Sequence, residues 1–151
     1  MVKSAYSKES SRFFFNIEGD VGPRGLNLAE DVELVRFGVF CLTKAPMAPG
    51  ENAADRQAFM AAARKVGFIG PYDADLGAAI LAYQKARGRV MDSTVSVISG
   101  QGTAGGQAYV LQTMLANMAA EYPSIYPRID QIMETGPALT ARVKSLFVGN
   151  F

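Results

Sequence analysis

Glycines and prolines divide this chain of 151 residues into short segments, each long enough for one helix. Pro46 and Pro49 follow the first apolar segment, and Gly67 and Gly88 follow the next two. Proline cannot continue a helix and glycine commonly terminates one, so these positions indicate where helices stop. We therefore expect a bundle of short helices joined by turns.

The first apolar segment predicts a helix over residues 28–42 with one buried face. That face is formed by four residues spaced three or four apart: Val32, Val35, Val39 and Leu42. Residues 27–30 resemble a capping box, in which a polar side chain is followed three positions later by an acidic one. We therefore expect Asn27 to cap this helix.

Two further helices are predicted between the breaks. Asn52 can cap one that ends near Val66. Asp73 or Asp75 can cap the other, which ends at Arg87 before the glycine. The two aspartates are two residues apart and do not share a helix face, so we interpret them as a cap and a turn residue rather than as a catalytic or metal-binding pair.

The C-terminal part of the chain has a different pattern. Residues 90–99 are rich in β-branched side chains and predict a short strand or an extended loop. Helices are predicted from Gln107 to about Glu121, over about 124–134 and over about 137–147, with prolines between them.

The N-terminal residues are polar except for a short aromatic and apolar run: Phe13, Phe14, Phe15 and Ile17. Three adjacent aromatic side chains cannot all face one core, so this run either covers the domain as a strand or docks on a partner. We expect residues 1–26 to form an N-terminal arm and residues 27–103 the helical core. Residues 104–151 would form a C-terminal helical extension packed on the same domain.

Several kinds of chemistry are excluded by what the chain lacks. With no histidine and one cysteine it has no histidine-ligated zinc, no catalytic triad, no Cys-His pair and no internal disulfide. Cys41 lies in an apolar run and is predicted to be a buried structural thiol. We expect no catalytic residues, no metal site and no cofactor. The net charge of +1 favours neither nucleic acid nor an anionic membrane as a partner.

Charged residues make up only 19% of the chain. A lasting interface with a partner explains this low charge, and so does an alanine-rich helical core. The N-terminus lacks the apolar run of about 7–15 residues that a signal peptide needs, and no segment reaches the length of a membrane span. We expect synthesis in the cytoplasm, with the protein either remaining there, becoming part of a particle, or leaving without a cleaved signal.

A turn, a helix and a second turn form the most informative motif. The turn Gly70-Pro71-Tyr72-Asp73 precedes the helix Ala79-Ile80-Leu81-Ala82-Tyr83-Gln84, which stops at Gly88 before the turn Asp92-Ser93. With an earlier helix containing Asp31-Val32-Glu33-Leu34-Val35, this order resembles the peptidoglycan-binding-like domain family. The resemblance implies a mainly α fold: a small orthogonal helical bundle of the peptidoglycan-binding-like type, here with an N-terminal arm and extra C-terminal helices.

The resemblance covers about residues 27–103 and includes departures from the family pattern. Ser93 stands where the family prefers glycine, and Leu76-Gly77 replaces the threonine that usually follows the first turn. Residues 43–66 would contain an inserted helix.

The resemblance implies binding rather than catalysis, with peptidoglycan or a similar glycan-peptide as the ligand. A shallow groove beside the third helix would use tyrosines for stacking or hydrogen bonding and polar side chains for sugar hydroxyls, amines and carboxylates. The candidate ligand-binding residues are Tyr72, Asp73, Tyr83, Arg87, Asp92 and Ser93.

The alternative is a structural or adaptor subunit that reuses the same fold, as in a phage tail or a contractile secretion machine. Such a subunit would form homo- or hetero-oligomers with another protein through its aromatic N-terminal arm or its C-terminal helices. A dinucleotide-binding reading of Gly100-Gln101-Gly102-Thr103-Ala104-Gly105 is disfavoured, because no second parallel strand follows the next helix. We interpret that segment as a hinge.

Overall fold

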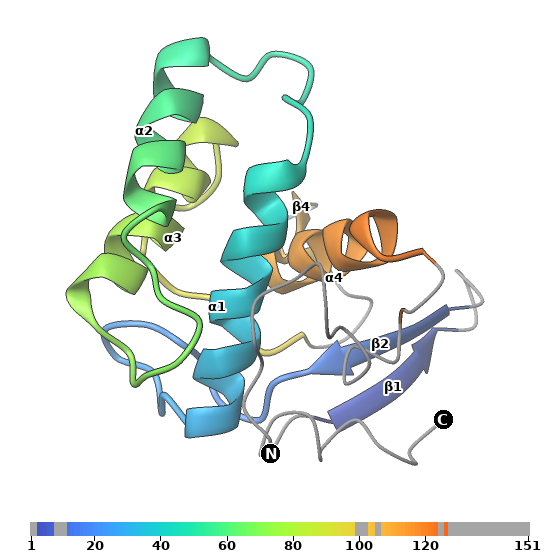
Figure 1. Cartoon of the computed structure of the whole chain (residues 1–151). Coiled ribbons are helices and arrows are strands. Elements are labelled where there is room, and N and C mark those ends of the chain that lie inside the picture. Colours follow the sequence, from blue (N-terminus) through green and yellow to red (C-terminus); the bar gives the residue numbers. More distant parts are fainter. Residues whose placement is uncertain (1–2, 8–11, 99–102, 105–106, 124–125, 127–151) are drawn as a thin grey trace.

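The computed structural model describes residues 3–7, 12–98, 103–104, 107–123 and 126, and within them it forms four helices and two antiparallel hairpins. The helices in Figure 1 are α1 (Ala29–Lys44), α2 (Ala53–Ala63), α3 (Ala74–Ala86) and α4 (Val110–Glu121). The strands are β1 (Lys3–Ser7), β2 (Arg12–Asn16), β3 (Thr103–Ala104) and β4 (Gln107–Ala108). The predicted mainly α helical bundle is confirmed.

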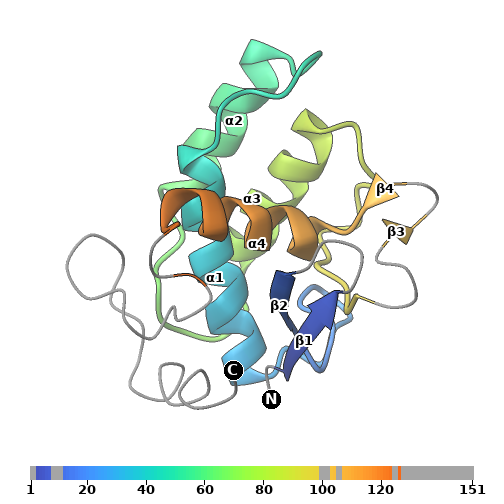
Figure 2. The ribbon, with the colours of Figure 1, turned by 90° about the vertical axis from the view of Figure 1, so that its right-hand side faces the viewer.

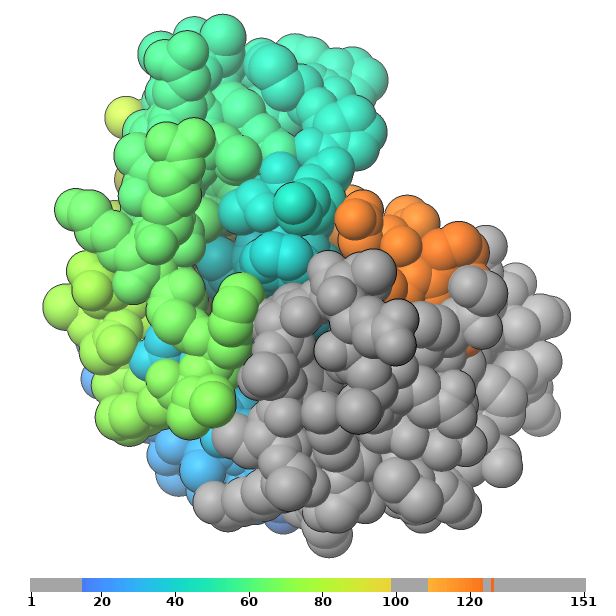
Figure 3. Space-filling model, in the orientation of Figure 1, coloured from blue at the N-terminus to red at the C-terminus, as the bar shows by residue number. Residues whose placement is uncertain are grey.

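Helix α1 is the central element of the bundle. Helices α2 and α3 pack together on one side of α1, and α4 crosses α1 on the other side (Figures 1 and 2). On the face seen in Figure 3, α1 reaches the surface as a strip between α2 and α4. Every residue from 31 to 39 is buried, so the predicted single apolar face was too narrow. Layers on both sides cover this part of α1 all round, and its two ends reach the surface.

The start of α1 is joined to the N-terminal segment by a buried carboxylate. Asp31 Oδ2 accepts hydrogen bonds from the backbone N–H groups of Glu18 and Gly19, at 3.1 and 2.9 Å. Burial is the main cause that raises the pKa of Asp31, and these two hydrogen bonds oppose it. The contact holds the segment that follows the β1–β2 hairpin against the first turn of α1.

The predicted capping role of Asn27 is wrong. Leu28 occupies the N-cap position of α1, and it makes no side-chain capping hydrogen bond. Asn27 has a left-handed backbone with φ of 50°, and its side chain bonds the N–H of Gly22 and the carbonyls of Gly22 and Gly25. The amide is therefore used to close the preceding turn, which competes with capping for the same side chain.

The other two predicted caps are confirmed. Asn52 Oδ1 accepts hydrogen bonds from the N–H groups of Ala54 and Asp55 at the start of α2. Asp73 Oδ1 accepts a hydrogen bond of 2.8 Å from the N–H of Leu76 at the start of α3. Helix α2 ends three residues earlier than predicted, at Ala63.

The N-terminal segment and α4 contribute to the same core as the central helices. Phe15 and Ile17 are buried, which agrees with the strand interpretation of the aromatic run. Gly38 of α1 leaves room for Met114 of α4, because a Cβ at Gly38 would collide with the methionine side chain. Buried Cys41, on the same helix, matches its prediction.

Residues 90–98 form an extended loop, as predicted, that returns to the N-terminal segment. Val95 pairs with Val21 in an antiparallel bridge, and the Asn16 amide bonds both the N–H and the carbonyl of Ile98. Helix α4 begins at Val110 rather than at 107, because residues 107–108 pair with β3.

The glycine-rich segment is described only in part. Its residues 103–104 belong to a short antiparallel hairpin, whereas a dinucleotide-binding turn leads from a parallel strand into a helix. The helices predicted over 124–134 and 137–147 lie outside the described residues. Among the helices that the structure describes, none is both long and apolar enough to cross a membrane.

Candidate functional site

The loop before α3 is held by a buried arginine from α1. The side chain of Arg36 is only 2% exposed, and its guanidinium donates hydrogen bonds to the carbonyls of Gly67 and Pro71. It also bonds the Asp73 carboxylate at 2.9 Å. One side chain therefore fixes both ends of the loop 67–73 to the central helix, although its Nε has no hydrogen-bond partner among the described residues.

Asp73 combines this ion pair with its capping role. The hydrogen bond from the backbone of Leu76 is the main cause that lowers the pKa of Asp73, and Arg36 lowers it further. The Asp73 side chain is nevertheless 48% exposed. Its contribution to stability is therefore partly screened by water.

Tyr72 lies against the first turn of α3. A Cβ at Gly77 would collide with the Tyr72 hydroxyl, so glycine is needed there for the tyrosine to take this position. This contact accounts for the glycine at position 77. Tyr72 is partly buried, and burial raises the pKa of its hydroxyl.

The turn after α3 is held by Gln84, which is itself 2% exposed. Its Nε2 donates to the Asp92 carboxylate at 2.9 Å and to the Thr94 carbonyl at 3.0 Å. Its Oε1 accepts from the N–H groups of Asp92 and Ser93. Both ends of the amide are thus used to fix residues 92–94.

Ser93 lies at the apex of that turn with a left-handed backbone, φ of 57°. Asp92 is exposed, and its Oδ1 also accepts a hydrogen bond from the N–H of Thr94. Glycine adopts a left-handed backbone without the steric cost of a side chain. Serine at position 93 therefore carries a steric cost that glycine would avoid.

Tyr83 is a core residue and offers no surface for stacking on a ligand. It is 2% exposed, its ring meets the Phe59 ring edge to face at 5.4 Å, and the Arg89 guanidinium lies over it at 5.9 Å. The stacking role proposed for Tyr83 is therefore not available in this structure. Its ring packs in the hydrophobic core instead.

The six candidate residues do not form one compact group. Tyr72 and Asp73 precede α3, whereas Arg87, Asp92 and Ser93 follow it. A helix of 13 residues is about 20 Å long, so α3 separates the two sets by about that distance. The C-terminal end of α3 therefore holds the larger cluster of candidate residues.

Two residues of this region were missed by sequence reasoning. Arg36 interrupts the apolar run Val35-Arg36-Phe37, and a lone charge inside such a run is a signal for a buried ionic or hydrogen-bonding role. Arg89 lies two residues after the C-cap of α3, and its Nη2 donates to Thr113 Oγ1 on α4 at 2.9 Å. No sequence pattern indicated that contact.

Nucleophilic and metal chemistry find little support in the described residues. Burial, with a smaller contribution from the charge of Glu121, raises the pKa of the Cys41 thiol to about 12, so this thiol is not a reactive nucleophile. No group of three or more potential metal-ligating side chains occurs in the part of the chain that the structure describes. Comparisons with protein-family models, curated proteins and solved structures gave no match.

Proposed function

We propose that this protein is a non-catalytic binding module that recognises cell-wall glycan-peptide, as its resemblance to peptidoglycan-binding domains implies. The binding surface would be the C-terminal end of α3 with the turn that follows it. Arg87, Asp92 and Ser93 would supply the polar contacts to the ligand. Tyr72 and Asp73 would contribute at most a second contact area at the other end of the helix.

The observation that carries this proposal is the fixed geometry of residues 92–94. The buried Gln84 amide makes four hydrogen bonds to this turn, while Asp92 remains exposed and Ser93 partly exposed. Polar groups that are already ordered lose less conformational freedom when a ligand binds. A short turn held in this way is therefore suited to recognition.

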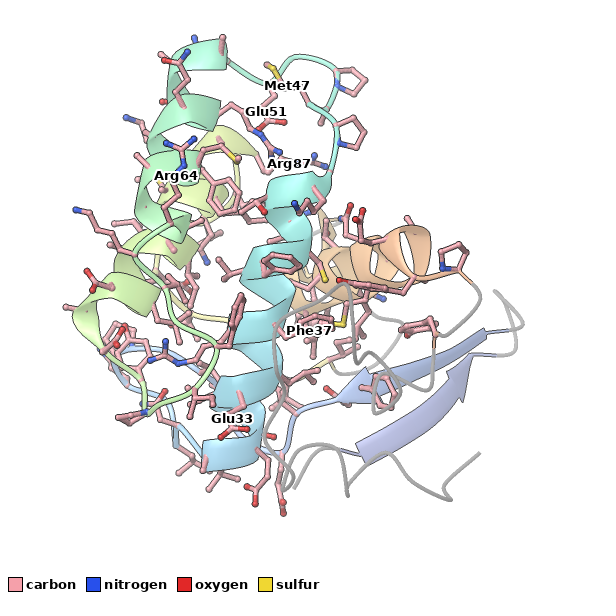
Figure 4. All side chains as sticks on the ribbon, viewed as in Figure 1. Glu33, Phe37, Met47, Glu51, Arg64 and Arg87 are labelled. Carbon is pink, nitrogen blue, oxygen red and sulfur yellow. The ribbon has the colours of Figure 1, made fainter. Side chains whose placement is uncertain are left out.

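Retention on purified peptidoglycan sacculi tests the proposal. We expect the native protein to sediment with sacculi, and Arg87→Ala and Asp92→Ala to sediment less. Arg64→Ala is the matched control, because Arg64 is an exposed arginine at the C-cap of α2, a different helix end (Figure 4). No retention of the native protein would reject glycan-peptide binding.

The second candidate is a structural or adaptor subunit of a larger assembly, such as a phage tail or a contractile secretion machine. Five large apolar side chains that the structure describes as exposed favour it: Leu26, Met47, Ile69, Val90 and Met91. All five lie on turns or loops. Polar side chains hold three of these segments: Asn27 holds the one with Leu26, Glu51 the one with Met47, and Arg36 the one with Ile69. Ordered apolar side chains of this kind are suited to protein contacts.

Light scattering coupled to size exclusion tests this second candidate. An assembly subunit should oligomerise as its concentration rises, and replacing the exposed Ile69 with serine should weaken that association if the loop takes part. A protein that stays strictly monomeric and soluble at high concentration would count against the assembly role.

A further inference from the structure

Two arginines flank Tyr83 at the C-terminal end of α3. Arg87 follows Tyr83 by four residues, which places both side chains on the same helix face. Arg89 comes from the next turn, and its guanidinium lies 5.9 Å from the centre of the Tyr83 ring. Two positive groups therefore share the surroundings of one buried tyrosine.

The acidic side chain near this tyrosine is already committed to another contact. The Glu51 side chain is 1% exposed, its Oε1 lies 3.9 Å from Arg56 Nη1, and its Oε2 accepts the N–H of Ala48. Glu51 directly precedes the N-cap of α2 in the loop that joins α1 to α2, and Figure 4 shows it between α2 and the end of α1. Glu51 therefore holds the loop through Oε2, while its Oε1 lies beside Arg56 without a hydrogen-bond partner among the described residues.

Arg87 has no such partner. The residue is partly buried, yet its guanidinium makes no hydrogen bond or ion pair with any residue that the structure describes. Burial is the main cause that lowers the pKa of Arg89, and the charge of Arg87 lowers it further. Two like charges near each other, one of them without a counter-charge, favour the binding of an anionic group.

The surface next to Arg87 suggests the rest of the ligand. Val90 and Met91 follow immediately along the chain and are 76% and 53% exposed. A ligand that carries a carboxylate together with small apolar groups matches both features. The C-terminal end of an alanine-containing peptide has this chemistry.

We propose that Arg87, with Arg89 raising the local positive potential, forms a carboxylate-binding position that takes the free C-terminal end of a short peptide. This inference rests on the proposed function, since the peptide stems of the cell wall provide such carboxylates. It specifies which group of the ligand contacts the C-terminal end of α3.

The test compares an alanine tripeptide that has a free C-terminal carboxylate with the same tripeptide amidated at its C-terminus. Each is titrated into the full-length native protein and followed by NMR chemical shifts. A charge-assisted hydrogen bond predicts that the free acid binds about tenfold more tightly than the amide at low salt. Arg87→Gln should abolish this difference, and Arg64→Gln, which removes the same charge from the C-cap of α2, should retain it.

Three results would overturn the inference. The free acid and the amide could bind equally well, or neither peptide could bind. The preference for the free acid could also persist in Arg87→Gln. Sacculus retention separates this failure from a failure of the proposed function. Equal retention of native protein and Arg87→Gln would leave glycan-peptide binding intact and reject the carboxylate position. A preference for the free acid without sacculus retention would support the position and reject cell-wall binding.

Discussion

The two turns that flank α3 are held in different ways. The loop 67–73 before the helix is fixed by a charged side chain from another element, Arg36 of α1. The turn 92–94 after the helix is fixed by a neutral side chain of α3 itself, Gln84. The first contact joins segments more than thirty residues apart along the chain, and the second joins segments at most ten apart.

This difference separates long-range from local order. Arg36 can make its contacts only after α1 and α3 have come together, so the loop 67–73 depends on the assembled bundle. Gln84 can make most of its contacts once α3 and its own following turn have formed. The candidate binding surface after α3 is therefore the more self-contained of the two flanks.

The largest expected effect comes from replacing Arg36 with methionine. The substitution preserves most of the apolar stem but leaves the carbonyls of Gly67 and Pro71 without their donor. Losing partners for buried polar groups should lower the free energy of unfolding by about 3 kcal/mol, measured by urea denaturation. Arg64→Met, at an exposed position, should change it by no more than about 0.5 kcal/mol. If Arg36→Met lowered the free energy of unfolding by less than Arg64→Met does, the loop 67–73 would not depend on Arg36.

Replacing Gln84 with methionine should cost about 2 kcal/mol, because four hydrogen bonds are lost but the turn is close to solvent. The comparison is sharpened by amide hydrogen exchange. Exchange at Asp92 and Ser93 should accelerate in Gln84→Met and remain near the native rate in Arg36→Met. Gln57→Met on the exposed face of α2 is the control. Equal acceleration in the Gln84 and Arg36 variants would remove the distinction between local and long-range order.

Ser93→Gly should stabilise the turn rather than weaken it. The left-handed backbone of Ser93 is strained for a residue with a side chain, and glycine should relieve about 1 kcal/mol of that strain. The greater conformational entropy of glycine in the unfolded chain offsets part of this gain. Asn27→Gly is the informative contrast, because Asn27 is also left-handed but its side chain makes three hydrogen bonds. That variant should be destabilised in thermal unfolding. Destabilisation of both would mean that Ser93 makes an important contact of its own.

Sequence patterns predicted the parts of this fold that depend on local chemistry. Asn52 and Asp73 cap the helices that follow them, and Gly88, with φ of 61°, ends α3. Asn27 carries the same local signal, but its side chain closes a turn instead. The local pattern could not distinguish these two uses of an amide.

The candidate site was less predictable, because its grouping depends on which residues lie close together in the folded structure. Residues near both ends of α3 were predicted to form one ligand-binding site, but a helix of this length keeps its ends apart. The partners of Arg36 lie more than thirty residues away, so no local pattern could assign them. Sequence reasoning therefore identified the helix well and the grouping of its polar neighbours poorly.

The smallest expected effect is a pH dependence confined to the flank before α3. The pKa of Asp73 is lowered in the folded protein below its usual value of 3.8, so its stabilising contribution is complete above that pH. As the pH falls through 3.8 toward the lowered pKa, the folded carboxylate must accept a proton and the contribution disappears. Because the side chain is 48% exposed, we expect a difference of only about 0.5 kcal/mol.

The measurement compares urea unfolding of native protein and Asp73→Asn at pH 6 and at pH 2.5. The native protein should be the more stable at pH 6, and its advantage should be smaller at pH 2.5. Asp75→Asn is the matched control, because Asp75 lies in the same helical turn and makes no hydrogen bond to Arg36. The advantage of native Gln84 over Gln84→Met should persist at the lower pH, since the hydrogen bonds of Gln84 to the backbone of residues 92–94 involve no titrating group. Equal stability of native protein and Asp73→Asn at pH 6 would mean that an amide caps the helix as well as the carboxylate does, and that Arg36 holds the loop through its carbonyl contacts alone.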